Sequence, residues 1–143
     1  NFAKIIKLFI MKSFKTLSTV LAFVLMANIA LAQTKNDWKE KNDFHKVMSQ
    51  TFHPAEEGDF APIRSRINEM VDKAEAFKNA KIPDGFNHQK EIKNNLKKLV
   101  KQTKSFRKKI NNGLSDADLK SDFIALHDVF HQVVGLCNAE DQH

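Results

Sequence analysis

The sequence predicts an all-α protein: an up-down-up-down four-helix bundle that follows a cleavable signal peptide. From about residue 36 onward, apolar side chains recur at steps of three and four residues, which is the spacing of one face of an α-helix. Turn-forming clusters of Pro, Gly, Asn and Asp interrupt this pattern three times. There is no run of alternating strand pattern and no glycine-rich phosphate loop. Four helices of about 20 residues joined by short connections are typical of an antiparallel bundle.

The N-terminal 32 residues have a different composition from the remainder. Residues 1–10 are interpreted as a spurious or leader extension, and residues 11–32 have the pattern of a secretory signal peptide: two lysines, an apolar segment and an Ala30-Leu31-Ala32 cleavage site. The apolar segment is shorter than the roughly 20 residues of a membrane-spanning helix. We therefore expect cleavage after Ala32, a periplasmic or secreted location, and no membrane attachment after cleavage.

The charge balance changes once this leader is set aside. The chain of 143 residues has 23 Lys and Arg against 17 Asp and Glu, but four of the lysines precede residue 33, so residues 33–143 have a net charge of only +2. No basic stripe with interleaved aromatic residues is present, so a nucleic-acid partner is not expected. The length of this part predicts a single domain at 33–143. Whether two copies associate as a homodimer is left open.

The first two helices are predicted from their periodicity and their end signals. The first extends from about residue 36 to 55, and Pro54 and Gly58 weaken and then end it. Asp59 is predicted to be the N-cap of the second helix, with Pro62 in its first turn. The predicted apolar face of the second helix consists of Ile63, Ile67, Met70, Val71, Ala74 and Phe77.

The third helix is predicted to start near Asn87 and to end at Asn111-Asn112-Gly113. Its lysines crowd the side opposite its apolar stripe and are most simply a solvated face. The fourth helix is predicted to extend from Asp116 to about Cys137, with Ser115 and Asp118 forming a capping box. Its predicted core seam consists of Leu119, Phe123, Leu126, Phe130, Val133 and Cys137.

Two histidines on the fourth helix are the main candidates for function. His127 and His131 are four residues apart, so they lie on one helix face and can offer two imidazoles to one metal ion or haem. If the first and fourth helices are antiparallel neighbours, His45 falls level with residues 126–130 and Met48 falls in the same layer. The two helix-four histidines are expected to face a neighbouring helix from a seam that flanks the core, and not to face open water.

Several further side chains could complete a metal site. His53 lies about two turns beyond His45, Glu56 and Glu57 lie about one turn further, and all three carry nitrogen or oxygen ligands. Imidazoles with a carboxylate suit Zn, whereas Met48 would shift the preference toward Cu. Cys137, the only cysteine, is a packed thiol, a metal ligand or half of an intermolecular disulfide. A di-iron site is excluded because no Glu lies three residues before either helix-four histidine.

The predicted bundle, signal peptide and ligand positions resemble those of the periplasmic four-helix-bundle cytochromes, both soluble b-type and c′-type. In the b-type group a Met on helix one and a His on helix four bind haem from opposite sides. By this resemblance Met48 with His127 or His131 would be the axial ligands. The chain differs in lacking the C-x-x-C-H attachment motif and in having additional histidines on helix one.

Three functional hypotheses follow from these patterns. The leading hypothesis is an exported bundle that buffers, senses or delivers Zn or Cu through His45, His127 and His131. The alternative is a b-type haem protein that carries electrons. The second alternative is a ligand-free interaction or stress protein whose lysine-rich face serves an acidic partner. We do not expect an enzyme, because the sequence shows no nucleophile–base pair and no paired catalytic carboxylates.

Overall fold

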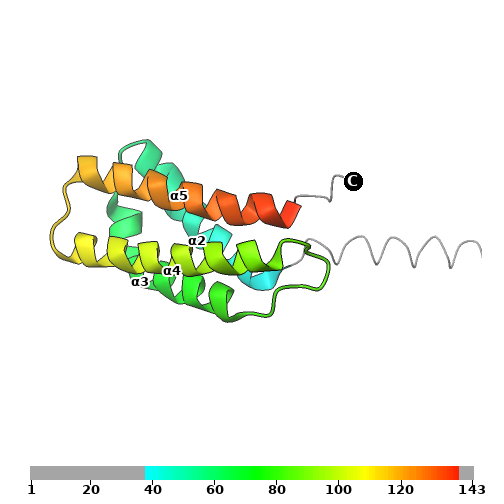
Figure 1. The fold of residues 1–143 in the computed structure, drawn as a ribbon. Helices are drawn as coiled ribbons and strands as arrows, with labels where there is room; N and C mark the ends of the chain where they lie inside the picture. Colours follow the sequence, from blue (N-terminus) through cyan, green and yellow to red (C-terminus); the bar gives the residue numbers. More distant parts are fainter. Residues whose placement is uncertain (1–37, 139–143) are drawn as a thin grey trace, which may run out of the picture. The chain divides into compact units, whose positions relative to one another are not determined.

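The computed structural model describes residues 38–138, and this part of the chain consists of four α-helices without a β-strand (Figure 1). The helices are α2 (Lys39–Glu56), α3 (Ala61–Asn79), α4 (Gln89–Asn111) and α5 (Asp116–Asn138). The all-α, four-helix prediction is confirmed. The predicted leader and signal peptide lie outside the described residues.

The four helices pack in a closed ring. Each helix contacts the next one in the chain, and α5 returns to contact α2 (Figure 1). The α2–α5 pair is antiparallel, because higher residue numbers on α2 meet lower numbers on α5. His45 stacks on Phe130, Phe52 contacts Phe123, and the Lys120 Nζ donates to the Glu56 carbonyl at 3.1 Å. The predicted neighbour relation of the first and last helices is therefore present.

The core is formed by the residues that the helical periodicity selects. All six apolar residues predicted for the face of α3 are buried, as are all six predicted for the seam of α5. Four phenylalanines are less than 2% exposed and fill the interior between the helices: Phe44, Phe77, Phe123 and Phe130. Burial of this apolar surface, at about 25 cal/mol per Å², is the main stabilising contribution to such a bundle.

The helix ends follow local chemistry, with one correction. Gly58 has a φ of +93°, in the left-handed region, and the N–H groups of Gly58 and Asp59 donate to the last carbonyls of α2. The residue preceding α3 is Phe60, so the prediction of Asp59 as N-cap is off by one position. Its carboxylate still accepts the Ala61 N–H at 3.0 Å, which satisfies a free N–H of the first turn.

The start of α5 confirms the cap by Ser115 and changes the second contact of the predicted capping box. The Asp118 N–H donates to the Ser115 Oγ at 3.2 Å, and the Ser115 hydroxyl donates to the Asp118 carboxylate at 2.7 Å. The carboxylate thus binds the cap hydroxyl itself. The predicted start of α4 near Asn87 is two residues early, since α4 begins at Gln89.

Candidate functional site: a histidine seam between α2 and α5

The central feature is a pair of imidazoles on one face of α5. The Nε2 atoms of His127 and His131 lie 3.1 Å apart, and the two rings are nearly perpendicular, at 80°, with centroids 4.3 Å apart. This distance allows one Nε2–H to donate to the lone pair of the other Nε2. The helical spacing of four residues brings the rings together, as the sequence predicted.

Helix α2 supplies an aromatic surface that orients the first imidazole. The Phe52 ring stacks on His127 with a centroid separation of 4.0 Å and an interplanar angle of 11°. Phe52 is itself held at an edge-to-face contact by Phe123, with centroids 5.2 Å apart. One face of the His127 ring is therefore covered, which fixes the plane in which its Nε2 points.

This environment favours the neutral form of His127. Burial against its neighbours lowers the pKa of His127 below its usual value of 6.5, and the nearby His131 lowers it further. The carboxylates of Asp128 and Glu56 oppose this shift, and His45 adds to it. Desolvation disfavours a charged imidazole, so His127 keeps a free nitrogen lone pair at neutral pH.

His45 belongs to the same layer but contacts a different ring. It is exposed on α2, and its imidazole stacks on Phe130 with centroids 5.4 Å apart at 22°. The Phe130 ring also lies 5.9 Å from the ring of His131. We call these five residues the histidine seam: His45, Phe52, His127, Phe130 and His131.

The structure brings only part of the predicted ligand set together. Among residues 38–138, no group of three or more His, Cys, Asp or Glu side chains is arranged to hold a metal ion. The histidine pair of α5 therefore stands as two ligands, with His45 and Glu56 near enough to influence its charge.

The remaining predicted ligands have separate surroundings. Met48 is fully buried in the core. The Nδ1 of His53 lies 3.0 Å from the Glu56 carboxylate, in an exposed pair at the end of α2, and Glu57 is exposed in the following turn. Cys137 is buried, and burial raises the pKa of its thiol, which favours the unreactive protonated form.

The seam is more open than the sequence indicated. His131 is exposed, His127 is partly buried, and Ile124 on the same flank of α5 is 43% exposed. The expectation that the two helix-four histidines face a neighbouring helix rather than water is thus wrong for His131. The reason is that α2 and α5 approach each other less closely than the other contacting helix pairs, with phenylalanine rings between them.

Sequence reasoning missed the role of Phe52 as a stacking platform for His127. The periodicity places Phe52 on the apolar face of the first helix, and the haem alternative would place it in the lining of the pocket. Its position two turns from His45 could have indicated a partner for an α5 imidazole, but a ring orientation depends on side-chain packing that a linear pattern does not contain.

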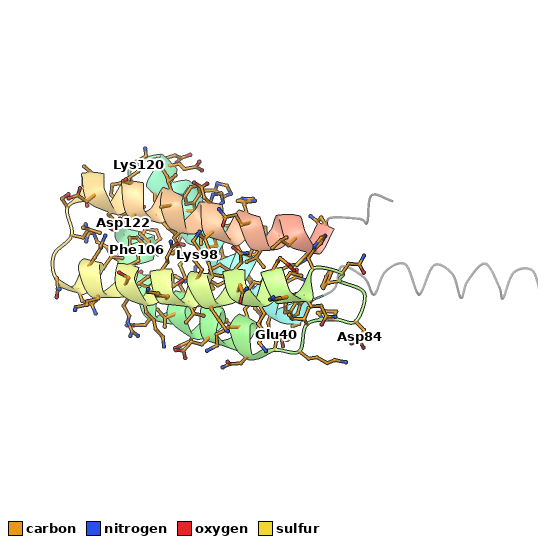
Figure 2. All side chains as sticks on the ribbon, in the orientation of Figure 1. Glu40, Asp84, Lys98, Phe106, Lys120 and Asp122 are labelled. Atoms are coloured by element: carbon orange, nitrogen blue, oxygen red, sulfur yellow. The ribbon has the colours of Figure 1, made fainter. Side chains whose placement is uncertain are left out.

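A hollow lies between α4 and α5, apart from the histidine seam. It encloses about 170 Å³ and is lined by Gln102, Ser105, Phe106, Lys109, Asp122, Ala125 and Leu126. Figure 2 shows Phe106 and Asp122 in this region. The Lys109 ammonium and Asp122 carboxylate form a 2.8 Å ion pair there.

Comparisons with known proteins add no relative: no protein-family model, curated protein or solved structure matches this chain. Within the described residues, none of the helices is both long and apolar enough to cross a membrane. Any function of the chain must therefore be inferred from the geometry and chemistry of its side chains.

Proposed function

We propose that the protein binds a transition-metal ion, Zn or Cu, reversibly through His127 and His131, and acts in buffering, sensing or delivery of that ion. The single observation that carries this proposal is the 3.1 Å separation of the two Nε2 atoms. Its setting in the periplasm or outside the cell rests on the signal-peptide pattern of residues 11–32.

The distance suits one shared ion. With metal–nitrogen bonds of about 2.0–2.1 Å, two nitrogens at this separation subtend roughly 100° at a common metal. That angle lies between the 90° of tetragonal sites and the roughly 109° of tetrahedral ones. Two imidazoles on successive turns of a rigid helix need little rearrangement to reach it.

Proton chemistry also supports binding at neutral pH. A metal ion requires a lone pair on each Nε2, whereas the pair without metal shares one Nε2–H between them. Binding replaces this shared proton, so the donor ring changes tautomer and carries its proton on Nδ1. Because burial keeps His127 neutral, little proton release from that ring is needed near pH 7.

The incomplete ligand set favours exchange over permanent binding. Structural zinc sites are closed by four protein ligands, whereas this pair leaves coordination positions open. Water, a rotated His45 or Glu56, or a donor from a partner protein could occupy them. An open site of this kind suits a protein that takes up an ion and passes it on.

The observations support a bare ion better than the b-type haem alternative. In that alternative, an imidazole nitrogen and a methionine sulfur would bind the haem iron from opposite sides, so both atoms would have to be free to face the iron. Here the two Nε2 atoms face each other, and Met48 is fully buried. No specific contact among the described residues favours haem.

Calorimetric titration of the purified protein with Cu²⁺ and Zn²⁺ tests the proposal. We expect one ion per chain, bound more tightly for Cu²⁺ in line with the usual order of divalent metal affinities. His127→Ala and His131→Ala should each abolish binding, and His53→Ala, which removes an exposed histidine of α2, is the matched control. If neither ion binds at micromolar levels, or if both α5 variants bind normally, the proposal is wrong.

A further inference from the structure

The positive charge of the described bundle is concentrated on one helix. Helix α4 has nine Lys or Arg side chains and one acidic residue, Glu91. Helix α5 has the opposite balance, with Lys120 and four aspartates, while α2 and α3 are close to neutral. The bundle therefore has a strongly cationic face on α4, although its overall net charge is small.

Six of these lysines form a straight line. Taking about 100° per residue, they fall within an arc of roughly 80°, and from first to last they extend about 27 Å along the helix. All six are exposed. We call this set the lysine stripe: Lys90, Lys93, Lys97, Lys101, Lys104 and Lys108.

Most of the lysine stripe has no internal counter-charge. Within residues 38–138, Lys104 forms an ion pair with Glu75 of α3, and the other five lysines form none. Like charges three or four residues apart on a helix repel each other, at a cost of a few tenths of a kcal/mol per pair. An anionic ligand along the stripe would remove that repulsion.

The flanks of the stripe define the width of such a ligand. Glu75 on α3 pairs with Lys104 on one side, and Asp122 on α5 pairs with Lys109 on the other (Figure 2 labels Asp122). Both carboxylates lie beside the C-terminal half of α4. A narrow anionic chain can follow the stripe without approaching either carboxylate, whereas a broad anionic surface such as a membrane meets both.

The side chains on and around the stripe further limit the class of anionic partner that can bind. Single-stranded nucleic acids bind through aromatic side chains on which bases stack, and the one aromatic side chain of α4, Phe106, is buried. Protein interfaces have an apolar centre, and the one large exposed apolar side chain among the described residues is Ile124, on α5. We propose that the lysine stripe binds a linear anionic polysaccharide, whose carboxylate or sulfate groups lie along α4.

Heparin oligosaccharides of increasing length, titrated at several salt concentrations, test this proposal. We expect affinity to rise with length until the chain covers about 27 Å and then to level off, and to fall steeply with added salt, as for other polyanions. Lys93→Gln/Lys97→Gln/Lys101→Gln should weaken binding at least about tenfold and reduce the slope of log affinity against log salt by about three.

A matched control separates the stripe from net charge alone. Lys39→Gln/Lys46→Gln/Lys120→Gln removes the same charge from exposed lysines on α2 and α5, and should bind heparin like the wild type. Circular dichroism confirms that both variants are folded.

Three results would overturn the proposal. One is absence of heparin binding by the folded wild type, and another is equal loss in both triple variants. The third is tighter stripe-dependent binding of duplex DNA, poly-glutamate or anionic vesicles than of heparin. The metal proposal is independent of all three, since the histidines are unchanged in every variant.

Discussion

The histidine seam and the lysine stripe both place basic side chains at helical spacing, yet their surroundings differ in kind. In the seam, Phe52 and Phe130 stack on imidazoles and fix ring planes, and partial burial lowers the pKa of His127. On the stripe, exposed lysines extend into water, and only Lys104 has an ion-pair partner among residues 38–138. Packing therefore determines geometry in the seam, which suits a short-range ligand bond. The stripe acts through charge alone, which suits a long polyanion.

Removal of the stacking ring should have the largest effect on the seam. Phe52→Ala deletes a side chain that is only 7% exposed and contacts Phe123 and His127. We expect a loss of about 3–5 kcal/mol in the free energy of unfolding, measured with urea. NMR titration should also show the pKa of His127 rising toward its usual value, because water replaces the ring.

Ile124→Ala is the control for that change, since Ile124 lies on the same flank of α5 but is 43% exposed. We expect it to cost far less than Phe52→Ala. Similar losses for the two variants would mean that the seam is not held by the Phe52 ring.

Metal should stabilise the wild type and not the seam variants. At a free Cu²⁺ concentration of about 100 times the Kd, binding to the native state adds roughly 2.7 kcal/mol to the free energy of unfolding. The thermal midpoint should rise accordingly in the wild type and in His53→Ala, and stay fixed in His131→Ala. An equal rise in all three proteins would place the metal elsewhere.

Acid should act on the seam in a defined direction. Because the folded-state pKa of His127 is lowered, the unfolded chain binds more protons below about pH 6.5, so acidification through this range destabilises the native state. The destabilisation by His127 is absent above the unfolded-state pKa of this histidine and reaches its full size below the lowered folded-state pKa. Urea unfolding at several pH values should show a smaller acid loss for His127→Gln than for the wild type. An identical pH profile for both proteins would show that His127 does not cause the loss of stability in acid.

The lysine stripe should have the smallest effect on stability. Lys93→Gln/Lys97→Gln/Lys101→Gln changes three exposed side chains without an ion pair in the described bundle, so each substitution should alter the free energy of unfolding by no more than about 0.5 kcal/mol. Relief of like-charge repulsion makes slight stabilisation the expected sign at low salt. A large loss of stability would show that these lysine stems pack against the bundle.

Local sequence chemistry determined most of the fold. The three- and four-residue spacing of Ile63, Ile67 and Met70 selects one buried face, because a helix turns by about 100° per residue whatever its neighbours. The Ser115–Asp118 cap and the positive φ of Gly58 likewise depend on adjacent residues. Two helix starts were misplaced, by one residue at α3 and by two at α4, and both shifts are within the usual variation of helix ends.

The geometry of the candidate site could not be predicted from the sequence alone. The four-residue spacing alone places His127 above His131, and antiparallel packing of α2 and α5 places His45 at their level. Only tertiary packing decided which rings touch. Phenylalanine rings lie between α2 and α5 and hold these helices apart. Phe52 stacks on His127, and His131 is exposed to water. Helical periodicity specifies the direction of a side chain from its own helix axis, but ring orientation and exposure depend on the distance to a helix some eighty residues away in the chain.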